Sequence, residues 1–235
     1  MFSNACTRNR HAIYGVMGLS QVDKTQVNST NGTAFMIAPG VLATAAHFVH
    51  RNNDPTQPAH QRFEVIRAPD VGQNMEVAEL VAEDTDRNVA LLKIRSPRSK
   101  DCLALEDRVV SIGTSCGSLG FPLAEVIFTE TGRTFNLVER FQGATISAFY
   151  QVQWPSGRSF PVYETDALMY SGSSGCPGFL VDGGVLGMHV RSRIDRPKAT
   201  SGKGNDAPES TRLAISLWVP SSDICTFARE HDIAV

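Results

Sequence analysis

A serine in a glycine-rich segment is the feature of this sequence that most directly suggests chemistry. Ser174 stands in the string GSSGCP at residues 172–177. A serine hydroxyl attacks a carbonyl only when a base removes its proton and nearby donors stabilise the negative charge that forms. Glycines around the serine permit a tight turn that aims backbone N–H groups into one concavity, so Gly172, Ser174 and Gly175 suit that task. The string alone is a weak signal, because most small-residue loops are only turns.

A histidine upstream supplies the candidate base. His47 ends the string GTAFMIAPGVLATAAH at residues 32–47. This string predicts two short strands around a turn at 38–40, and they deliver the histidine at their end. The structural alternative is a histidine that is satisfied in the core at the end of a strand. His47 and Ser174 can meet only if the two halves of the chain pack face to face.

These two strings, in this order, resemble the histidine and serine segments of trypsin-like serine proteases. Segments at 120–122, 143–148 and 213–220 resemble the HtrA-type branch of that family, so the resemblance covers most of the chain. No C-terminal PDZ module follows, which departs from typical HtrA proteins. The resemblance implies an all-β protein with two perpendicular six-stranded β-barrels (trypsin-like) and an active site in the cleft between them.

The resemblance also implies a division of the chain and a set of roles. Residues 1–115 would form the N-terminal barrel, which carries His47, and residues 116–235 the C-terminal barrel, which carries Ser174 and a short helix. Ser174 Oγ would attack a peptide carbonyl, and His47 would pass the proton to the leaving amine. The backbone N–H groups of Gly172 and Ser174 would hold the oxyanion.

The third member of the triad departs from the family pattern. The family places an aspartate two residues before an ALL run, and here that position is Asn88, in the string DTDRNVALL. Asparagine accepts a hydrogen bond from imidazole but carries no charge, and in trypsin the same exchange costs about 10⁴-fold in kcat. Three interpretations follow. Asn88 orients His47, or Asp86 or Asp84 takes the role through a shifted loop, or the protein is a weakened relative that keeps the fold for binding.

Specificity is predicted to depend on His189 and Met169. His189 follows Ser174 at the spacing where trypsin-like enzymes line the primary specificity pocket, and imidazole can donate to a carboxylate or an amide oxygen. This slightly favours Glu or Gln as the residue before the cleaved bond (P1). Met169 beside His189 would instead favour a bulky apolar residue. An Arg or Lys preference is disfavoured because Leu168 stands where trypsin has its pocket aspartate. The alternative for His189 is a core-facing hairpin residue.

Many short apolar runs between turn residues, with almost no helical pattern, favour barrels or a sandwich. A glycine-rich link is expected at 114–120, and a short amphipathic helix capped by Ser221-Ser222-Asp223 is expected through Glu230. The polar segment 191–212 is expected to be exposed and mobile, to rim the specificity pocket and to order when a substrate or partner binds. The predicted strands are 12–22, 33–37, 41–44, 63–67, 75–81, 89–94, 108–112, 121–128, 141–148, 150–154, 160–164, 179–181, 185–190 and 213–219.

Composition narrows the classes of function. A net charge of −2 over 235 residues argues against a nucleic-acid or membrane partner. With no long apolar run and no signal-peptide pattern, the expectation is an intracellular, cytoplasmic protein. The five cysteines are widely spaced and are expected to be reduced, and Cys176 is not expected to be the nucleophile. The histidines and carboxylates show no metal-ligand spacing, so neither a metal nor another cofactor is expected.

The leading hypothesis is a serine endopeptidase that cleaves a protein or peptide substrate. An activating partner or a fused module remains open. The alternative from another class is a silent barrel protein that binds peptides in its cleft. An esterase with the same triad is a third option, which no residue favours.

Overall fold

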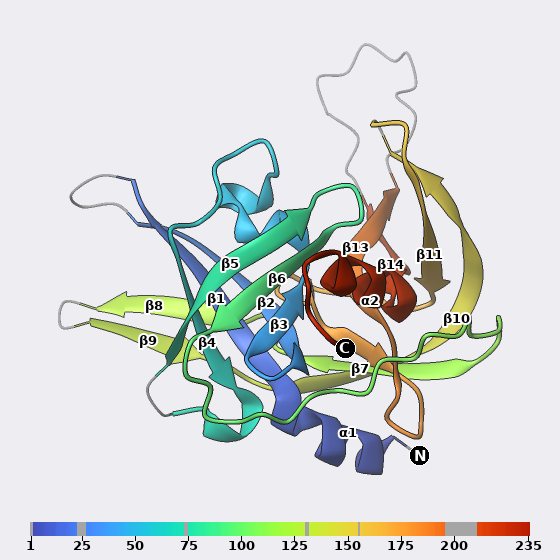
Figure 1. Ribbon diagram of the computed structural model, residues 1–235, viewed down its shortest axis with the longest axis horizontal. Helices are drawn as coiled ribbons and strands as arrows, with labels where there is room; N and C mark the ends of the chain where they lie inside the picture. The colour runs from blue at the N-terminus through green and yellow to red at the C-terminus, as the bar shows by residue number, and fades with distance from the viewer. Residues whose placement is uncertain (1, 23–26, 73–74, 130–131, 155, 196–210) are drawn as a thin grey trace.

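Two six-stranded β-barrels make up most of the protein (Figure 1). The computed structural model describes residues 2–22, 27–72, 75–129, 132–154, 156–195 and 211–235. The first barrel consists of β1 (Ile13–Gln21), β2 (Val27–Ala38), β3 (Val41–Thr44), β4 (Arg62–Arg67), β5 (Glu76–Asp84) and β6 (Val89–Ile94). The second consists of β7 (Ser115–Gly120), β10 (Arg140–Gln153), β11 (Ser159–Thr165), β12 (Pro177–Phe179), β13 (Val185–Asp195) and β14 (Thr211–Pro220). Hydrogen bonding closes them in the orders β1-β2-β3-β6-β5-β4 and β10-β11-β14-β13-β12-β7, which confirms the predicted fold class.

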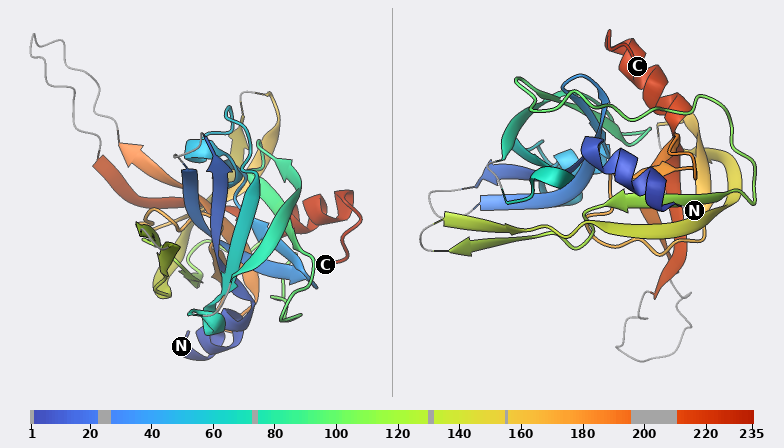
Figure 2. Two further views of the ribbon diagram at one scale, coloured as in Figure 1. Left: turned by 90° about the vertical axis from the view of Figure 1, so that its left-hand side faces the viewer. Right: turned by 90° about the horizontal axis from the view of Figure 1, so that it is seen from below.

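The remaining elements are short. A two-stranded hairpin of β8 (Glu125–Thr129) and β9 (Gly132–Asn136) extends from the body on the side of the first barrel (Figures 1 and 2). Helices α1 (Ser3–Asn9) and α2 (Ser221–Glu230) lie near the two ends of the chain, and the 3₁₀ turns are η1 (Arg10–Ala12), η2 (Ala46–Val49), η3 (Arg51–Asn53) and η4 (Ala68–Asp70). None of the described helices is long and apolar enough to cross a membrane.

The two barrels are packed against each other through a shared apolar core. Strand β1 is buried from Ile13 through Ser20, because the second half of the chain covers its outer side. A Cβ at Gly15 would lie 3.1 Å from the side chain of Leu137 and 3.3 Å from that of Phe121. Both side chains belong to the same cluster of buried residues as the interior of the first barrel. Burial of this continuous surface fixes the loops of one barrel relative to those of the other.

Each end of the chain makes contacts with the barrel that is more distant from it in sequence. The ring of Phe2, just before α1, lies 5.4 Å from that of Phe141 in the second barrel. Asn9 Nδ2 also donates a 2.9 Å hydrogen bond to Gly183 O, in the turn between β12 and β13. At the other end, Glu230 of α2 accepts two hydrogen bonds of 2.7 and 2.8 Å from Arg87 of the first barrel. These contacts tie each end of the chain to the barrel formed by the other half.

Most predicted strands are present, but several boundaries were wrong. The expected link at 114–120 is strand β7, because its glycines serve close packing: a Cβ at Gly120 would lie 2.2 Å from Cys176 Sγ. The segment that joins the barrels lies earlier, between β6 and β7. The strand expected over 108–112 is absent, since Val109 and Ile112 are each 64% exposed. The run 121–128 contains a turn before β8 begins.

Three further differences concern the ends of elements. Strand β2 begins at Val27, within the region expected to be a polar turn. Strand β13 continues to Asp195, so residues 191–195 of the expected excursion are strand, and residues 196–210 lie outside the described chain. Helix α2 has the predicted extent, but no side chain caps it, and Ser221 Oγ instead donates to Val185 O. Helix α1 was not predicted.

Candidate active site

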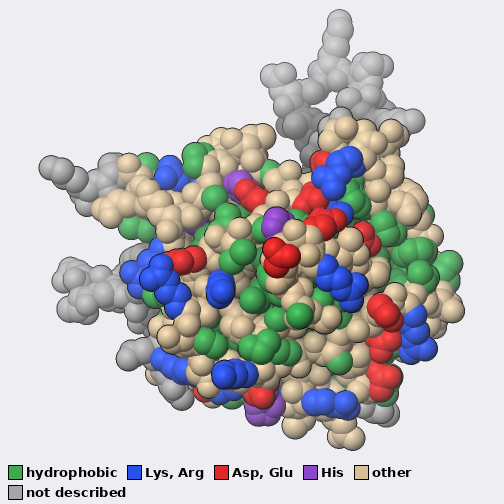
Figure 3. Space-filling view, in the orientation of Figure 1, with side chains coloured by type: hydrophobic (Ala, Val, Ile, Leu, Met, Phe, Trp, Pro, Cys, Tyr) green, Lys and Arg blue, Asp and Glu red, His purple; other side chains and the backbone are tan. Residues whose placement is uncertain are grey.

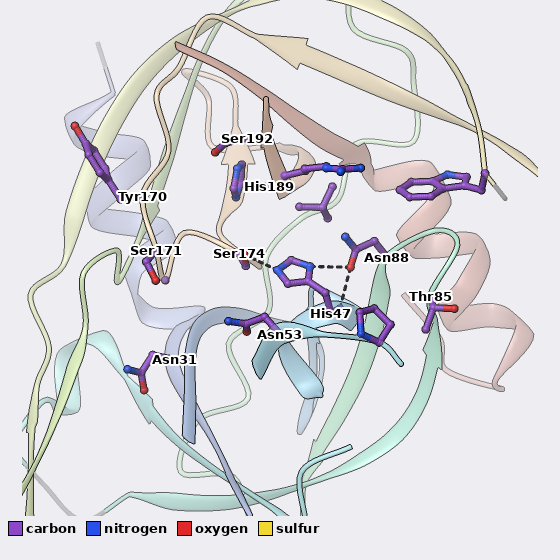
Figure 4. Close-up of a pocket in the computed structure, with 15 residues that line it drawn as sticks. Asn31, His47, Asn53, Thr85, Asn88, Tyr170, Ser171, Ser174, His189 and Ser192 are labelled. Carbon is purple, nitrogen blue, oxygen red and sulfur yellow. Dashed lines mark hydrogen bonds between the residues drawn. The ribbon is translucent and has the colours of Figure 1, made fainter. Parts of the chain in front are cut away.

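The two barrels bring the predicted serine and histidine together. His47 lies in η2, directly after β3 of the first barrel, and Ser174 lies in the loop that precedes β12 of the second. His47 Nε2 and Ser174 Oγ are 2.8 Å apart, although 127 residues separate them in sequence. Figure 4 shows the His47 ring held between Ser174 on one side and Asn88 on the other. This is the face-to-face arrangement that the sequence required.

Asn88 is the residue that contacts the far side of the imidazole. Its Oδ1 lies 3.0 Å from His47 Nδ1 and accepts a second 3.0 Å hydrogen bond from the backbone N–H of His47. A backbone N–H can only donate, so the oxygen of the amide, not its NH₂ group, must face His47. The ring nitrogen that faces the same oxygen must then carry the proton. Nε2 is left as an acceptor for the Ser174 hydroxyl, which is the tautomer that a general base requires.

The backbone around Asn88 supports this orientation. Asn88 has a φ of 58°, in the left-handed region that asparagine tolerates better than most residues. Its carbonyl accepts a 3.2 Å hydrogen bond from the N–H of Ala46, the residue before His47. The histidine turn and the Asn88 turn are therefore linked by backbone as well as side chain.

The two aspartates considered for the same role are engaged elsewhere. Asp84 Oδ1 accepts hydrogen bonds from the backbone N–H groups of Asp86 and Arg87, both at 3.0 Å. Arg158 forms ion pairs with Asp84 at 2.9 Å and with Asp86 at 3.5 Å. Within the described chain neither carboxylate contacts His47, so the structure brings only Asn88 to the imidazole.

The loop that carries Ser174 is held in a conformation that requires glycine. Gly172 and Gly175 both have a φ of +85°. A Cβ at Gly175 would lie 1.9 Å from the carbonyl oxygen of Thr33 in β2, so the loop packs directly on the first barrel. Thr33 also donates its N–H to Ser174 O at 2.9 Å and its hydroxyl to Gly172 O at 3.0 Å. One residue of the first barrel thus fixes both ends of the Gly172-Ser173-Ser174 turn.

Two backbone donors of this turn, predicted from the sequence to hold an oxyanion, form no hydrogen bond with the described residues. Within the described chain, the N–H groups of Gly172 and Ser174 have no hydrogen-bond acceptor, whereas those of Ser173 and Gly175 bond to Tyr170 O and His189 O. The Ser173 hydroxyl is buried and accepts a 3.1 Å hydrogen bond from the N–H of Tyr170, which fixes the start of the loop. Two backbone donors at the serine are therefore available to a ligand.

A cavity of about 470 Å³ opens at the serine and includes His189. His189 is 3% exposed and lines this cavity with His47, Asn88, Gly172 and Ser174, as predicted. Met169 lines a different cavity of about 260 Å³ behind the loop, together with Ser173 and Cys176. The predicted pairing of Met169 with His189 in one pocket is not what the cavity lining shows.

Other lining residues were not recognised in the sequence. Asn53, Trp154 and Tyr170 come from three separate segments, which only the closure and packing of the barrels bring together. Arg191 and Ser192 also line the cavity, in agreement with the expectation that the segment after His189 rims it. Figure 4 shows Tyr170, Ser171 and Ser192 on the second-barrel side of the cavity and Asn53 and Thr85 on the first-barrel side.

Burial lowers the pKa of His47 below its ordinary value of 6.5. The hydrogen bond to Asn88 raises this pKa, and the positive charge of Arg191 lowers it further. His47 is therefore neutral, as a base must be, over a wider pH range than a free imidazole. Burial also raises the pKa of Cys176 to about 11, so this nearby thiol is protonated and a poor nucleophile. The five cysteines are all free, and no cluster of described residues has the composition of a metal site.

The fold and the site define a two-barrel protein with a serine, a histidine and an amide in line. Residues 32–188, more than half of the chain, match the family model described as trypsin-like peptidase domain. The chain belongs to this family.

Two proteins from Rickettsia are similar to this chain in sequence. Proteins described as probable periplasmic serine endoprotease DegP-like, from Rickettsia conorii and Rickettsia prowazekii, are 29% and 27% identical over 215 residues. The matches cover 85% of this chain but only 35% of each relative, so the chain spans about a third of their length. The predicted membership of the trypsin-like family is thus confirmed by the family model, and the relatives are described as serine endoproteases of the DegP-like kind.

Solved structures agree on the fold. The active form of the Rv3671c protease from M. tuberculosis superposes with a TM-score of 0.68 at 18% identity, covering 98% of this chain and 85% of that one. The inactive form of the same protease gives a TM-score of 0.64 at 17% identity, covering 97% and 92%.

Proposed function

We propose that the protein is a serine endopeptidase that works through an acyl-enzyme on Ser174. Ser174 Oγ attacks the peptide carbonyl while its proton passes to His47 Nε2, and the N–H groups of Gly172 and Ser174 hold the oxyanion. His47 then gives the proton to the leaving amine as the C–N bond breaks. A water molecule, deprotonated by His47, attacks the ester, and the proton returns to Ser174 Oγ as the acid product leaves.

One observation carries this proposal: the Ser174 hydroxyl lies 2.8 Å from the nitrogen of His47 that the Asn88 contact leaves unprotonated. Nucleophile, base and orienting group therefore have the order that acyl transfer needs. Asn88 is assigned the third position because its oxygen lies 3.0 Å from Nδ1, while Asp84 and Asp86 pair with Arg158. The neutral amide predicts a slower enzyme than one with aspartate at this position.

For specificity, we infer a P1 preference for Glu or Gln. The buried side chain of His189 lines the same cavity as Ser174, where an imidazole donor can bind a carboxylate or an amide oxygen. The competing preference for a bulky apolar residue loses support, because Met169, its second wall, lines a separate cavity. A peptide library varied at P1 tests the assignment, and equal cleavage after Glu and Leu would count against it.

The decisive experiment compares the wild-type protein with Ser174→Ala, using an active-site serine reagent and a peptide library. Ser111→Ala serves as the matched control, because Ser111 is exposed and lies in the segment that connects β6 to β7. Labelling and cleavage that disappear only in Ser174→Ala support the enzyme. Peptide binding without labelling of the wild type supports the silent binding module, for which the neutral Asn88 is the favouring observation.

The location of the protein is part of the same proposal. Five free cysteines are compatible with the cytoplasm, where thiols stay reduced. The Rickettsia relatives, by contrast, are described as proteins of the periplasm. Fractionation of cells that express the chain from its own locus distinguishes the two. Its substrates are proposed to be proteins or peptides in either case.

A further inference from the structure

Arg191 stands out among the residues of the site cavity. It lies on β13, two residues after His189, and its side chain is exposed. Among the described residues that line the cavity, Arg191 is the one Arg or Lys, and none is an Asp or Glu. The charge of the cavity is therefore positive, although the chain as a whole carries −2. On the face of the molecule that Figure 3 shows, basic and acidic side chains are intermixed.

The neighbouring arginines are already paired. Arg158 pairs with Asp84 at 2.9 Å, and Arg193, on the same strand as Arg191, pairs with Glu164 at 3.2 Å. Arg191 forms no ion pair or side-chain hydrogen bond with any described residue. An exposed guanidinium with five donors and no partner beside a substrate cavity is suited to bind a carboxylate of the ligand.

The position of Arg191 relative to the base indicates which part of a peptide it would meet. Burial is the main cause of the lowered pKa of His47, and the positive charge of Arg191 adds to it, so the guanidinium acts on the imidazole. Both residues line the same cavity as Ser174. A peptide bound at Ser174 would therefore share this cavity with Arg191.

Strand β13 also offers an edge to an extended peptide. Its pairing with β12 ends at Met188, and two further bonds join His189 to Gly175 and Cys176. On the other edge, pairing with β14 continues to Asp195. Beyond His189 the first edge makes no backbone hydrogen bond with the described chain, so a peptide can add there as a strand. Successive side chains of such a strand point to opposite faces, so if P1 enters the His189 pocket, P2 points away from it. The register of β13 shifts between these two residues, since His189 pairs with Trp218 and Arg191 with the adjacent Leu217, and this places Arg191 on the face opposite to His189.

We propose that Arg191 binds an acidic side chain at P2, so that the cleft selects peptides with Asp or Glu directly before the P1 residue. This subsite is distinct from the His189 pocket. The inference rests on the proposed function only for the direction of the bound peptide, which decides which residue is P2. A charge-assisted hydrogen bond of this kind predicts about a tenfold preference for the acid over its amide.

The test uses pairs of peptides that share the same P1 residue and differ only as Asp against Asn at P2. For wild type, kcat/KM is expected to be about tenfold higher for the Asp peptide, with a ratio that falls as salt is added. Arg191→Gln is expected to bring the ratio to about one, and Arg191→Glu to favour Lys over Asp at P2. Arg193→Gln, which removes a paired arginine of the same strand, is the matched control and should leave the ratio unchanged.

Binding of the same peptides to Ser174→Ala, followed by fluorescence anisotropy, separates this inference from the proposed function. Acid-selective binding that depends on Arg191, without any turnover by wild type, would retain the subsite and overturn the enzyme. Turnover with equal rates for Asp and Asn would retain the enzyme and overturn the subsite. Thermal unfolding of each variant identifies any loss of binding that comes from misfolding. If Arg191→Glu is misfolded, the Asp/Asn ratio of the milder variant Arg191→Gln decides whether the subsite exists.

Discussion

Asn88 separates two tasks that a triad carboxylate performs together. Its Oδ1 orients the imidazole through Nδ1 and is itself held by the backbone N–H of His47. It supplies no negative charge to stabilise the imidazolium that forms as Ser174 is deprotonated. The site therefore has the geometry of a catalytic triad but lacks the negative charge of its carboxylate. Adding that charge at position 88, without a change of geometry, should raise the rate.

Replacing Asn88 by Asp is expected to raise kcat/KM by roughly tenfold to a hundredfold. The gain should be smaller than the 10⁴-fold effect known for trypsin, because the tautomer here is already correct. Steady-state kinetics on one peptide measures it. Asp86→Asn, whose carboxylate pairs with Arg158 and not with His47, is the control and should change kcat/KM little. If Asp86→Asn lowered the rate and Asn88→Asp had no effect, the assignment of Asn88 would be wrong.

The pH profile follows from the same residue. His47 must be neutral to act as a base, and burial lowers its pKa below 6.5, so the acid limb of kcat/KM should have its midpoint below 6.5. In Asn88→Asp the new carboxylate stabilises the imidazolium, so the midpoint should move to higher pH. Stopped assays over pH 4–9 with a single substrate measure both. A wild-type midpoint above 6.5 would contradict the buried, uncharged environment.

At the scale of elements, the loops that carry the site are fixed by contacts between segments far apart in sequence. The turn before β6 is closed by Asp84, which accepts two backbone N–H groups. Arg87 then ties this turn to Glu230 of α2, and its guanidinium also lies 5.2 Å from the centre of the Phe160 ring. Asn88 follows directly, so its orientation depends on a helix that comes more than a hundred residues later.

Gly175→Ala is expected to prevent the serine loop from docking. The new Cβ would meet Thr33 O at 1.9 Å, and the φ of +85° is strained for alanine. A loss of at least about 3 kcal/mol of unfolding free energy is expected, since the clash is with backbone. Gly157→Ala is the matched control: its φ is +87°, but no atom lies within 4 Å of the new Cβ. It should cost about 1 kcal/mol. Urea denaturation measures both, and equal losses would contradict the role of the Thr33 contact.

The sequence predicted most strands and both chemical strings because each depends on local pattern. Val89–Ile94 is mostly apolar and forms β6, and the string around His47 forms the end of β2 and all of β3 as expected, followed by the unpredicted turn η2. Strand β7 was mistaken for a link because its glycines serve contacts with Cys176 and Thr33 that no local pattern contains. Helix α1 is short and polar, and its last residue, Asn9, bonds to Gly183 of the second barrel, which is distant in sequence. The choice among Asn88, Asp86 and Asp84 likewise needed the tertiary pairing of Arg158.

At the scale of the whole molecule, the site lies where the two barrels meet. Thr33 of β2 holds the serine loop through its backbone and hydroxyl, and the same hydroxyl accepts a 3.0 Å hydrogen bond from the N–H of Phe121. Phe121 follows β7 of the second barrel. A single fully buried threonine thus connects both barrels at the site.

Thr33→Val is expected to lower kcat/KM by about tenfold or more and stability by about 2 kcal/mol. Valine keeps the shape of threonine but leaves Gly172 O and the Phe121 N–H buried without a partner. Thr33→Ser, which keeps the hydroxyl, should retain most of the activity. Kinetics and urea denaturation of the pair measure the two effects. Lost stability with unchanged kcat/KM would mean that the hydroxyl supports the fold without positioning the serine loop.

Because His47 and Ser174 come from different barrels, neither half of the chain can hydrolyse a peptide alone. The strand-free stretch between β6 and β7 offers a place to cut the polypeptide without breaking either barrel. Two separately expressed fragments would then report on their own reassembly, since hydrolysis would begin only once the fragments had recombined. The same division would make the protein a reporter in which proteolysis signals the proximity of two fused partners.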